Sequence, residues 1–211
     1  MTEAEWLEAG DPLAMLRFLD KRLSDRKFRL FACACCRRFW HMLSCPPAQP
    51  AVEAAERYAD GLISGRQLAD IACDRWSEIE PIAGISADKV LRAVQAAAAV
   101  SRGYRAAIWE SFGYIQQVDE DQRAQANLLR DLAGNPYRTP HLQPACLTWN
   151  DSTVVRIAQA IYDDRAFNHL PILADALEDA GCDDAVLLAH CRGAGPHVRG
   201  CWAVDLLLGK E

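Results

Sequence analysis

Residues 170–209, LPILADALEDAGCDDAVLLAHCRGAGPHVRGCWAVDLLLG, combine a helical pattern with a dense group of reactive side chains. Apolar residues recur every three or four positions, which predicts helical segments over 171–180, 183–192 and 196–208. A glycine-rich turn at 193–195 separates the last two segments. The stretch therefore predicts short helices that pack through apolar faces, with thiol, imidazole and guanidinium groups between them.

The same periodicity extends toward the N-terminus. In residues 24–43, SDRKFRLFACACCRRFWHML, the apolar positions at helical spacing include Phe28, Phe31, Cys35, Phe39 and Met42. Ser24 is expected to cap this helix, and the wide apolar stripe predicts a deeply buried position. Three prolines within residues 44–50 are expected to end it.

Helical patterns account for most of the remaining chain. Further helices are expected after Asp11, after Ser64, from Ser86 and over 119–133, where Gly134 follows. Strand alternation is scarce, so the sequence predicts an all-α protein, a compact multi-helix array of about nine to ten helices. Its expected parts are an N-terminal helical region over 1–134, a proline-containing linker or loop over 135–150 and a C-terminal helical subdomain over 151–211.

Composition sets limits on partners and compartment. The chain has 211 residues, of which 51% are apolar, and a net charge of −6. This charge argues against broad nucleic-acid binding, which depends on Lys and Arg displacing counterions from phosphates. No uninterrupted run of about 18 apolar residues is present, so no membrane span is expected. Nine unevenly spaced cysteines, with no secretory leader pattern after Met1, predict a cytoplasmic protein with reduced thiols.

Several segments resemble an uncharacterised family of planctomycete bacterial proteins. The resemblance lies in residues 1–7, 24–43, 128–138 and 149–210. Residues 170–185 also distantly resemble the repeat-companion domains found beside leucine-rich repeats in such bacteria, although Ala176 stands where those domains have a tryptophan. The resemblance implies a folded module and carries no activity or catalytic residue with it.

The cysteines and histidines of the C-terminal stretch are candidate metal ligands. They are Cys182, His190, Cys191, His197 and Cys201. Zinc favours four thiolate or imidazole ligands, and His197 and Cys201 would share one face of a helix because they are four residues apart. His190 or Cys191 could join them across the glycine turn, with Cys182 as a fourth ligand. The alternative interpretation is that the cysteines are buried apolar thiols, because the spacing matches no known zinc finger.

The glycine-rich turn also suggests an anion site. Its candidate residues are Arg192, Gly193, Gly195 and Arg199. A helix beginning near Pro196 would offer free backbone amides, and the two arginines would add bidentate donors for a phosphate group. The alternative is an ordinary interhelical turn, in which glycines adopt positive φ and the arginines pair with nearby aspartates.

A third group lies in the apolar helix over 24–43. Cys33, Cys35 and Cys36 precede two arginines that could lower a thiol pKa, and His41 could act as a base. The apolar character of this helix predicts instead that the thiols are buried and unreactive.

No nucleophile elbow, HExxH motif or EF-hand loop occurs in the sequence. We therefore expect a non-enzymatic helical interaction module with a protein partner. Two alternatives stay open: a small zinc-binding protein that uses the C-terminal Cys and His residues, and an enzyme or sensor that binds a phosphate or another anion.

Overall fold

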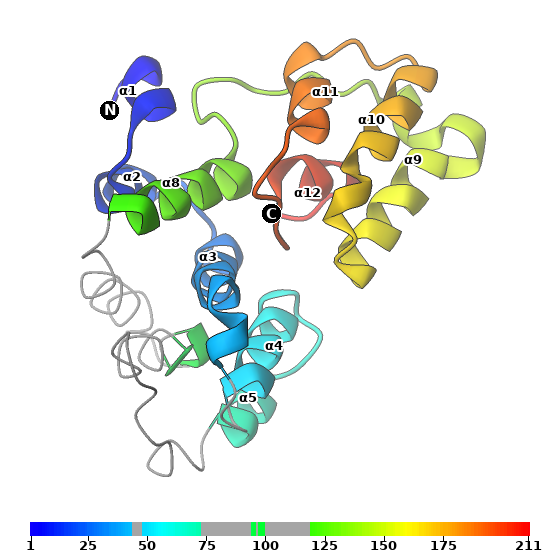
Figure 1. The fold of residues 1–211 in the computed structure, drawn as a ribbon. Coiled ribbons are helices and arrows are strands. Elements are labelled where there is room, and N and C mark those ends of the chain that lie inside the picture. The colour runs from blue at the N-terminus through cyan, green and yellow to red at the C-terminus, as the bar shows by residue number, and fades with distance from the viewer. Residues whose placement is uncertain (44–47, 73–93, 96, 100–118) are drawn as a thin grey trace. The chain divides into compact units, whose positions relative to one another are not determined.

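The computed structural model describes residues 1–43, 48–72, 94–95, 97–99 and 119–211 (Figure 1). All regular secondary structure in these ranges is helical, and no strand occurs among them. The prediction of an all-α protein is therefore confirmed. The long helix expected from Ser86 falls mostly outside the described residues.

The chain divides into two compact units. Unit 1 comprises Met1–Glu8 and Asn127–Glu211, and unit 2 comprises Ala9–Ala126. Helix α8 (Asp119–Ala133) contains the boundary between them. These bounds differ from the expected ones, because the first eight residues belong with the C-terminal unit and the boundary lies inside a helix rather than in 135–150.

Unit 2 contains helices near the N-terminus of the chain. They are α2 (Pro12–Leu19), α3 (Asp25–Arg38), the 3-10 helix η1 (Trp40–Met42), α4 (Ala48–Ala59) and α5 (Gly65–Ala72). Asp11 caps α2 by accepting a hydrogen bond from the Leu13 amide at 2.9 Å. Ser24 caps α3 by accepting from the Lys27 amide at 3.2 Å. Both caps were expected from the sequence.

Helix α3 is buried along most of its length, as its wide apolar stripe predicts. Every residue from Lys27 to Cys36 is buried. Arg37 continues the helix and donates two hydrogen bonds to the Glu56 carboxylate of α4, at 2.6 and 2.8 Å. Helix α3 therefore packs on α4 through an apolar face, and the bidentate Arg37–Glu56 ion pair joins the two helices near the C-terminal end of α3.

Unit 1 is formed by a second set of helices. They are α1 (Glu3–Glu8), the C-terminal part of α8, α9 (Pro144–Asp164), the 3-10 helix η3 (Phe167–His169), α10 (Leu170–Asp179), α11 (Ala185–Arg192) and α12 (Trp202–Leu208). Helix α10 contacts α9 and α11, and α12 contacts α9. Leucine, valine and alanine side chains from these four helices form one buried core.

The predicted linker over 135–150 is partly helical. Helix α9 begins at Pro144, and its regular geometry is interrupted at Trp149–Ser152, where Asn150, Asp151 and Ser152 have positive φ. Proline suits the first turn of a helix because its missing N–H has no partner there. The prolines at 136 and 140 thus lie in a loop, whereas the third starts a helix.

None of the described helices has the length and apolar character required to cross a membrane.

Candidate metal centre

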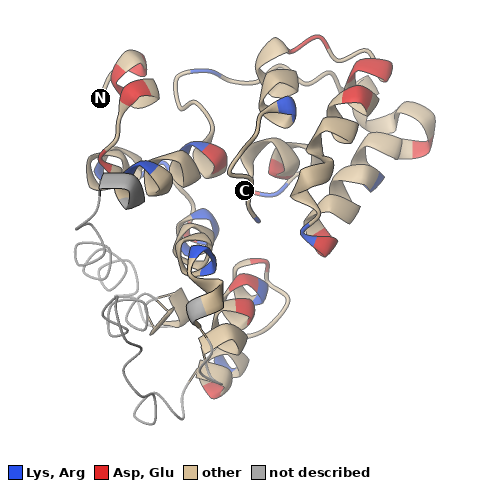
Figure 2. Cartoon of the chain, in the orientation of Figure 1, with Lys and Arg blue, Asp and Glu red and all other residues tan. Residues whose placement is uncertain are grey.

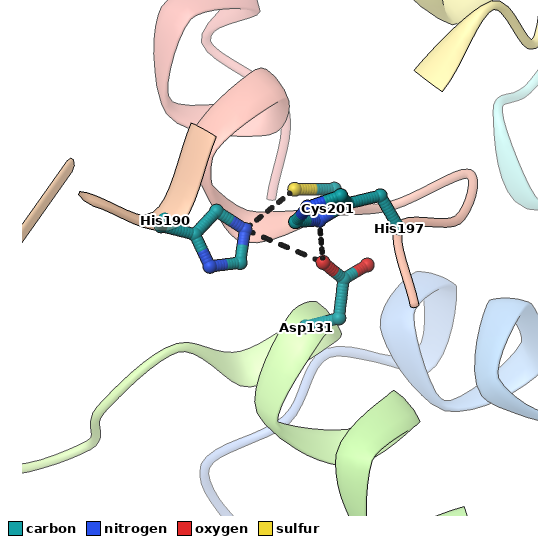
Figure 3. A group of neighbouring side chains, drawn as sticks. All are labelled: Asp131, His190, His197 and Cys201. Carbon is teal, nitrogen blue, oxygen red and sulfur yellow. Dashed lines mark hydrogen bonds and ion pairs between the residues drawn. The ribbon is translucent and has the colours of Figure 1, made fainter. Parts of the chain in front are cut away.

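Four side chains from unit 1 converge on one point (Figure 3). Asp131 comes from the last turn of α8, His190 from α11, and His197 and Cys201 from the loop between α11 and α12. One ligand atom from each residue lies within 4.8 Å of the other three. All four residues are buried or half-buried, so the cluster is enclosed by the unit.

A loop, rather than a helix, brings His197 and Cys201 together. The helix expected over 196–208 begins at Trp202, so residues 196–201 are not helical and that prediction is wrong. The chain turns at Val198, whose carbonyl accepts a hydrogen bond from the Cys201 amide at 2.9 Å. Gly195 enters this turn with a φ of +78°, where an added Cβ would lie 2.8 Å from the His197 backbone nitrogen. Glycine alone adopts this positive φ without strain and has no Cβ to clash with the His197 nitrogen.

Asp131 uses both carboxylate oxygens. Its Oδ1 atom lies 2.7 Å from His197 Nδ1 and 3.3 Å from His190 Nε2, while Oδ2 accepts a hydrogen bond from the Val198 amide at 3.0 Å. Burial alone would raise the pKa of this carboxyl group. The hydrogen bonds from His190 and His197, with the positive charge of His197, outweigh burial, so the pKa of Asp131 is held below its usual range.

His197 has an acceptor at each ring nitrogen. Nδ1 faces the Asp131 carboxylate, and Nε2 lies 3.1 Å from the Gly193 carbonyl oxygen. A ring that donates from both nitrogens is an imidazolium. Burial opposes that charge, but the hydrogen bond to Asp131, its negative charge and the contact with Gly193 together raise the pKa of His197.

His190 connects the remaining members of the cluster. Its Nε2 atom lies 3.1 Å from Cys201 Sγ and 3.3 Å from Asp131 Oδ1. Its Nδ1 atom accepts a hydrogen bond from the Trp202 indole at 3.1 Å. The ring of His190 is therefore held from both sides, with Nε2 directed into the cluster.

Cys201 is fully buried. Burial, followed by the negative charge of Asp131, raises the pKa of its thiol well above the usual value, and the backbone amides of Val204 and Ala203 only partly oppose this. A buried thiol that stays protonated at neutral pH is a poor nucleophile. The contact between Cys201 and His190 therefore does not resemble an activated cysteine–histidine pair, although a bound cation would favour the thiolate.

The donor set fits zinc. Two imidazole nitrogens, one thiolate sulfur and one carboxylate oxygen all belong to the ligands that Zn²⁺ accepts. Zinc–ligand bonds of about 2.0–2.3 Å in a tetrahedron separate neighbouring donors by about 3.3–3.6 Å. His190 Nε2 lies 3.3 Å from Asp131 Oδ1 and 3.1 Å from Cys201 Sγ, close to that range. His197 Nδ1 is only 2.7 Å from Asp131 Oδ1, a hydrogen-bond length, and all four donors lie within 4.8 Å, so small shifts of the side chains would be needed to complete a tetrahedron. Four protein donors would complete the tetrahedron, as in structural rather than catalytic zinc sites.

The structure groups three of the five predicted ligands, namely His190, His197 and Cys201. Cys182 and Cys191 are buried in the core of unit 1 and lie outside the group. Burial raises the pKa of the Cys191 thiol to about 12, and it also raises the pKa of Cys182. The fourth member, Asp131, is more than fifty residues from the others in sequence, and sequence reasoning missed it.

One signal in the sequence could have identified Asp131. It lies in the last turn of α8, where the helix dipole disfavours a carboxylate. It also sits among the buried leucines 128, 129 and 132, and it is itself only 3% exposed. A buried acid in such a position needs a cation or several hydrogen-bond donors.

The residues of the predicted anion site face other partners. Arg192 donates to Glu178 and Asp175 of α10, at 2.5–3.0 Å, where Figure 2 shows acidic residues on α10 and a basic residue on α11. The Arg199 guanidinium lies 4.5 Å from the centre of the Tyr162 ring. Gly193 follows the last turn of α11, and Gly195 supplies the positive φ of the loop. No helix begins near Pro196, so the free amides that suggested an anion site are not at this turn.

The thiols of α3 behave as the apolar pattern predicts. Cys33, Cys35 and Cys36 are buried free cysteines. Burial raises the pKa of Cys33 and of Cys36 far above the ordinary thiol value. The prediction that these thiols are buried is confirmed, and the raised pKa values of Cys33 and Cys36 disfavour the reactive thiolate.

Comparisons with protein-family models, with curated proteins and with solved structures found no match to this chain. The resemblance to a planctomycete family therefore stays a prediction.

The metal-free cluster predicts a specific pH dependence of stability. The raised pKa of His197 contributes stability that is fully present below its unfolded value of about 6.5 and is lost as the pH rises through the folded pKa. The lowered pKa of Asp131 contributes stability that is present above about 3.9 and is lost as the pH falls through its folded pKa. A difference of one between the folded and unfolded pKa of a group changes the free energy of unfolding by about 1.4 kcal/mol.

Chemical denaturation with a chelator present, carried out from about pH 2 to pH 9, measures both effects. The free energy of unfolding of the metal-free protein should be highest between the acid loss from Asp131 and the alkaline loss from His197, and it should fall above neutral pH. Asp131→Asn should remove most of the alkaline decline, because His197 then loses its charged partner. An unchanged alkaline decline in this variant would show that His197 and Asp131 are not the responsible pair.

Proposed function

We propose that this chain is a metal-binding protein in which Asp131, His190, His197 and Cys201 hold a structural zinc ion. The convergence of four donors of the types zinc prefers, within 4.8 Å of one another, carries the proposal. The neighbouring contacts support it as well. The second oxygen of Asp131 is fixed by the Val198 amide, and Nε2 of His197 faces the Gly193 carbonyl. Such outer contacts orient ligands in most metal sites.

Zinc would connect parts of unit 1 that are distant in sequence. Asp131 belongs to α8, whereas the other three ligands lie in and after α11. A structural ion between them supports the expectation of a non-enzymatic module, because four protein ligands leave no coordination position for a substrate. Its protein partner stays a prediction.

Elemental analysis of protein purified without chelators tests the proposal. We expect about one zinc per chain in the unmodified protein and a large loss in Cys201→Ser, because a serine hydroxyl is a much weaker zinc ligand than a thiolate. Cys191→Ser is the matched control, since Cys191 is equally buried but lies outside the cluster. Cobalt substitution should give a thiolate-to-cobalt absorption band in the control and none in Cys201→Ser.

Two results would contradict the proposal. One is less than about a tenth of an equivalent of zinc in the unmodified protein, with no uptake when zinc is added. The other is equal zinc content in Cys201→Ser and Cys191→Ser, which would place the metal elsewhere.

A further inference from the structure

Trp202 lies beside the cluster at the start of α12. Its ring centre is 4.9 Å from that of His190, and its indole nitrogen is 3.1 Å from His190 Nδ1. On another side, the ring lies against Gly134, where an added Cβ would be 3.1 Å from Trp202 Cγ. Gly134 also has a φ of +67°, so no side chain is favoured there. The indole thus lies between the Gly134 backbone, which has no side chain, and the His190 imidazole.

The direction of the indole hydrogen bond determines which nitrogen of His190 carries the proton. An indole N–H can only donate, so His190 Nδ1 must be the acceptor. In a neutral imidazole the proton then resides on Nε2. That is the nitrogen directed toward Cys201 and Asp131.

A metal ion at Nε2 needs the lone pair that this proton occupies. When Nε2 binds a metal, a neutral imidazole carries its proton on Nδ1. That N–H would then face the indole N–H of Trp202, and two donors cannot bond to each other. His197 presents no such conflict, because its outer nitrogen faces the Gly193 carbonyl, which accepts a proton from a ligand ring.

We infer that Trp202 sets the metal affinity of the site by holding His190 in the tautomer that does not bind metal at Nε2. The inference rests on the proposed function. Metal binding then requires the indole–imidazole hydrogen bond to break and the His190 proton to move from Nε2 to Nδ1. Trp202 is a positioning residue in this scheme, because it acts on the metal only through His190.

Trp202→Phe is the direct test, since it removes the N–H donor and keeps an aromatic ring against Gly134. Zinc affinity is measured by competition with a chromogenic chelator. We expect zinc to bind about 3- to 10-fold more tightly to the variant, the equivalent of one hydrogen bond lost from the metal-free state. Trp149→Phe is the matched control, because Trp149 packs against the same core and is not one of the four clustered residues. Its zinc affinity should be unchanged.

The indole resonances give a second readout that packing alone would not move. In the ¹H–¹⁵N spectrum of the unmodified protein, one indole signal should shift on addition of one equivalent of zinc. That signal should be the one missing from Trp202→Phe and present in Trp149→Phe.

The outcomes separate this inference from the proposed function. If the unmodified protein and both variants take up no zinc, the metal site itself is wrong. If all three bind zinc but Trp202→Phe binds equally or less tightly than the control, or the Trp202 signal does not move, the site stands and the role of Trp202 is wrong.

Discussion

Removal of zinc with a chelator should lower the free energy of unfolding of unit 1 by about 4 kcal/mol. A ligand that binds only the folded state stabilises it by RT ln(1 + [L]/Kd), which is about 4 kcal/mol when free zinc is about 1,000 times Kd. For a domain of fewer than about 100 residues, this corresponds to a fall in melting temperature of roughly 15–30 °C. The effect should exceed that of any single surface substitution.

The metal-free unit should nevertheless remain partly folded. Without the ion, the His197 imidazolium still pairs with the Asp131 carboxylate at 2.7 Å, and Cys201 is the one member of the cluster that belongs to the apolar core of α9 to α12. Hydrogen exchange measures the difference. Amides in 127–133 and 190–205 should exchange faster after chelation, whereas those of α3 and α4 in unit 2 should not change.

Cys201→Ser provides the control for chelation. Its melting temperature should not respond to the chelator, because the variant holds little zinc at the start. If the unmodified protein contains zinc and chelation leaves its melting temperature unchanged, the ion is bound without a structural role.

The pH dependence of the zinc contribution should have the opposite sign to that of the metal-free protein. Zinc binds neutral imidazole and thiolate, so protons leave His197 and Cys201 as the ion enters. The extra stability from zinc should therefore grow from pH 6 to pH 8, while the metal-free protein loses the stability that the charged His197 provides.

The helices could be predicted from the sequence because their causes are local. Apolar spacing, the caps at Asp11 and Ser24 and the glycine after α8 each act within a few residues. The helix expected from Pro196 is the exception. A proline at that position suits the first turn of a helix, but the chain instead makes a turn closed by Val198 and Cys201.

The candidate site could be predicted only in part. His190, His197 and Cys201 lie within twelve residues of one another, so their grouping was visible in the sequence. Asp131 joins them through the tertiary arrangement of α8. The leucines around it indicate a buried acid, but no local pattern shows which residues it meets. Cys182 and Cys191 have the right chemistry, but the loop before α11 and α11 itself place them in the apolar core, outside the cluster. Residue type therefore indicated a metal site, and packing determines which of these residues lie together in the candidate cluster.

Trp6→Ala should destabilise unit 1 by about 3–5 kcal/mol, as expected for truncation of a fully buried tryptophan. Trp6 is 1% exposed although its helix has only six residues. A helix this short gains most of its stability from tertiary packing. The Trp6 backbone carbonyl accepts two hydrogen bonds from the Arg130 guanidinium, at 2.9 and 3.2 Å. The Glu3 carboxylate accepts one from the Asn135 side-chain amide at 2.7 Å. Residues 1–8 therefore attach to the segment that carries Asp131.

Chemical denaturation measures the loss of stability, and hydrogen exchange of the amides in 127–138 shows whether it reaches the end of α8. Trp6→Phe should lose much less stability, because a phenyl ring fills most of the same space, and Leu7→Ala is the exposed control, since Leu7 is 55% exposed on the same helix. A loss below about 1 kcal/mol in Trp6→Ala would show that residues 1–8 do not belong to the folded core of unit 1. Arg130 immediately precedes Asp131 in α8, so release of α1 should also weaken zinc binding. Equal zinc affinity in Trp6→Ala and Leu7→Ala would show that the N-terminal helix does not affect the metal centre.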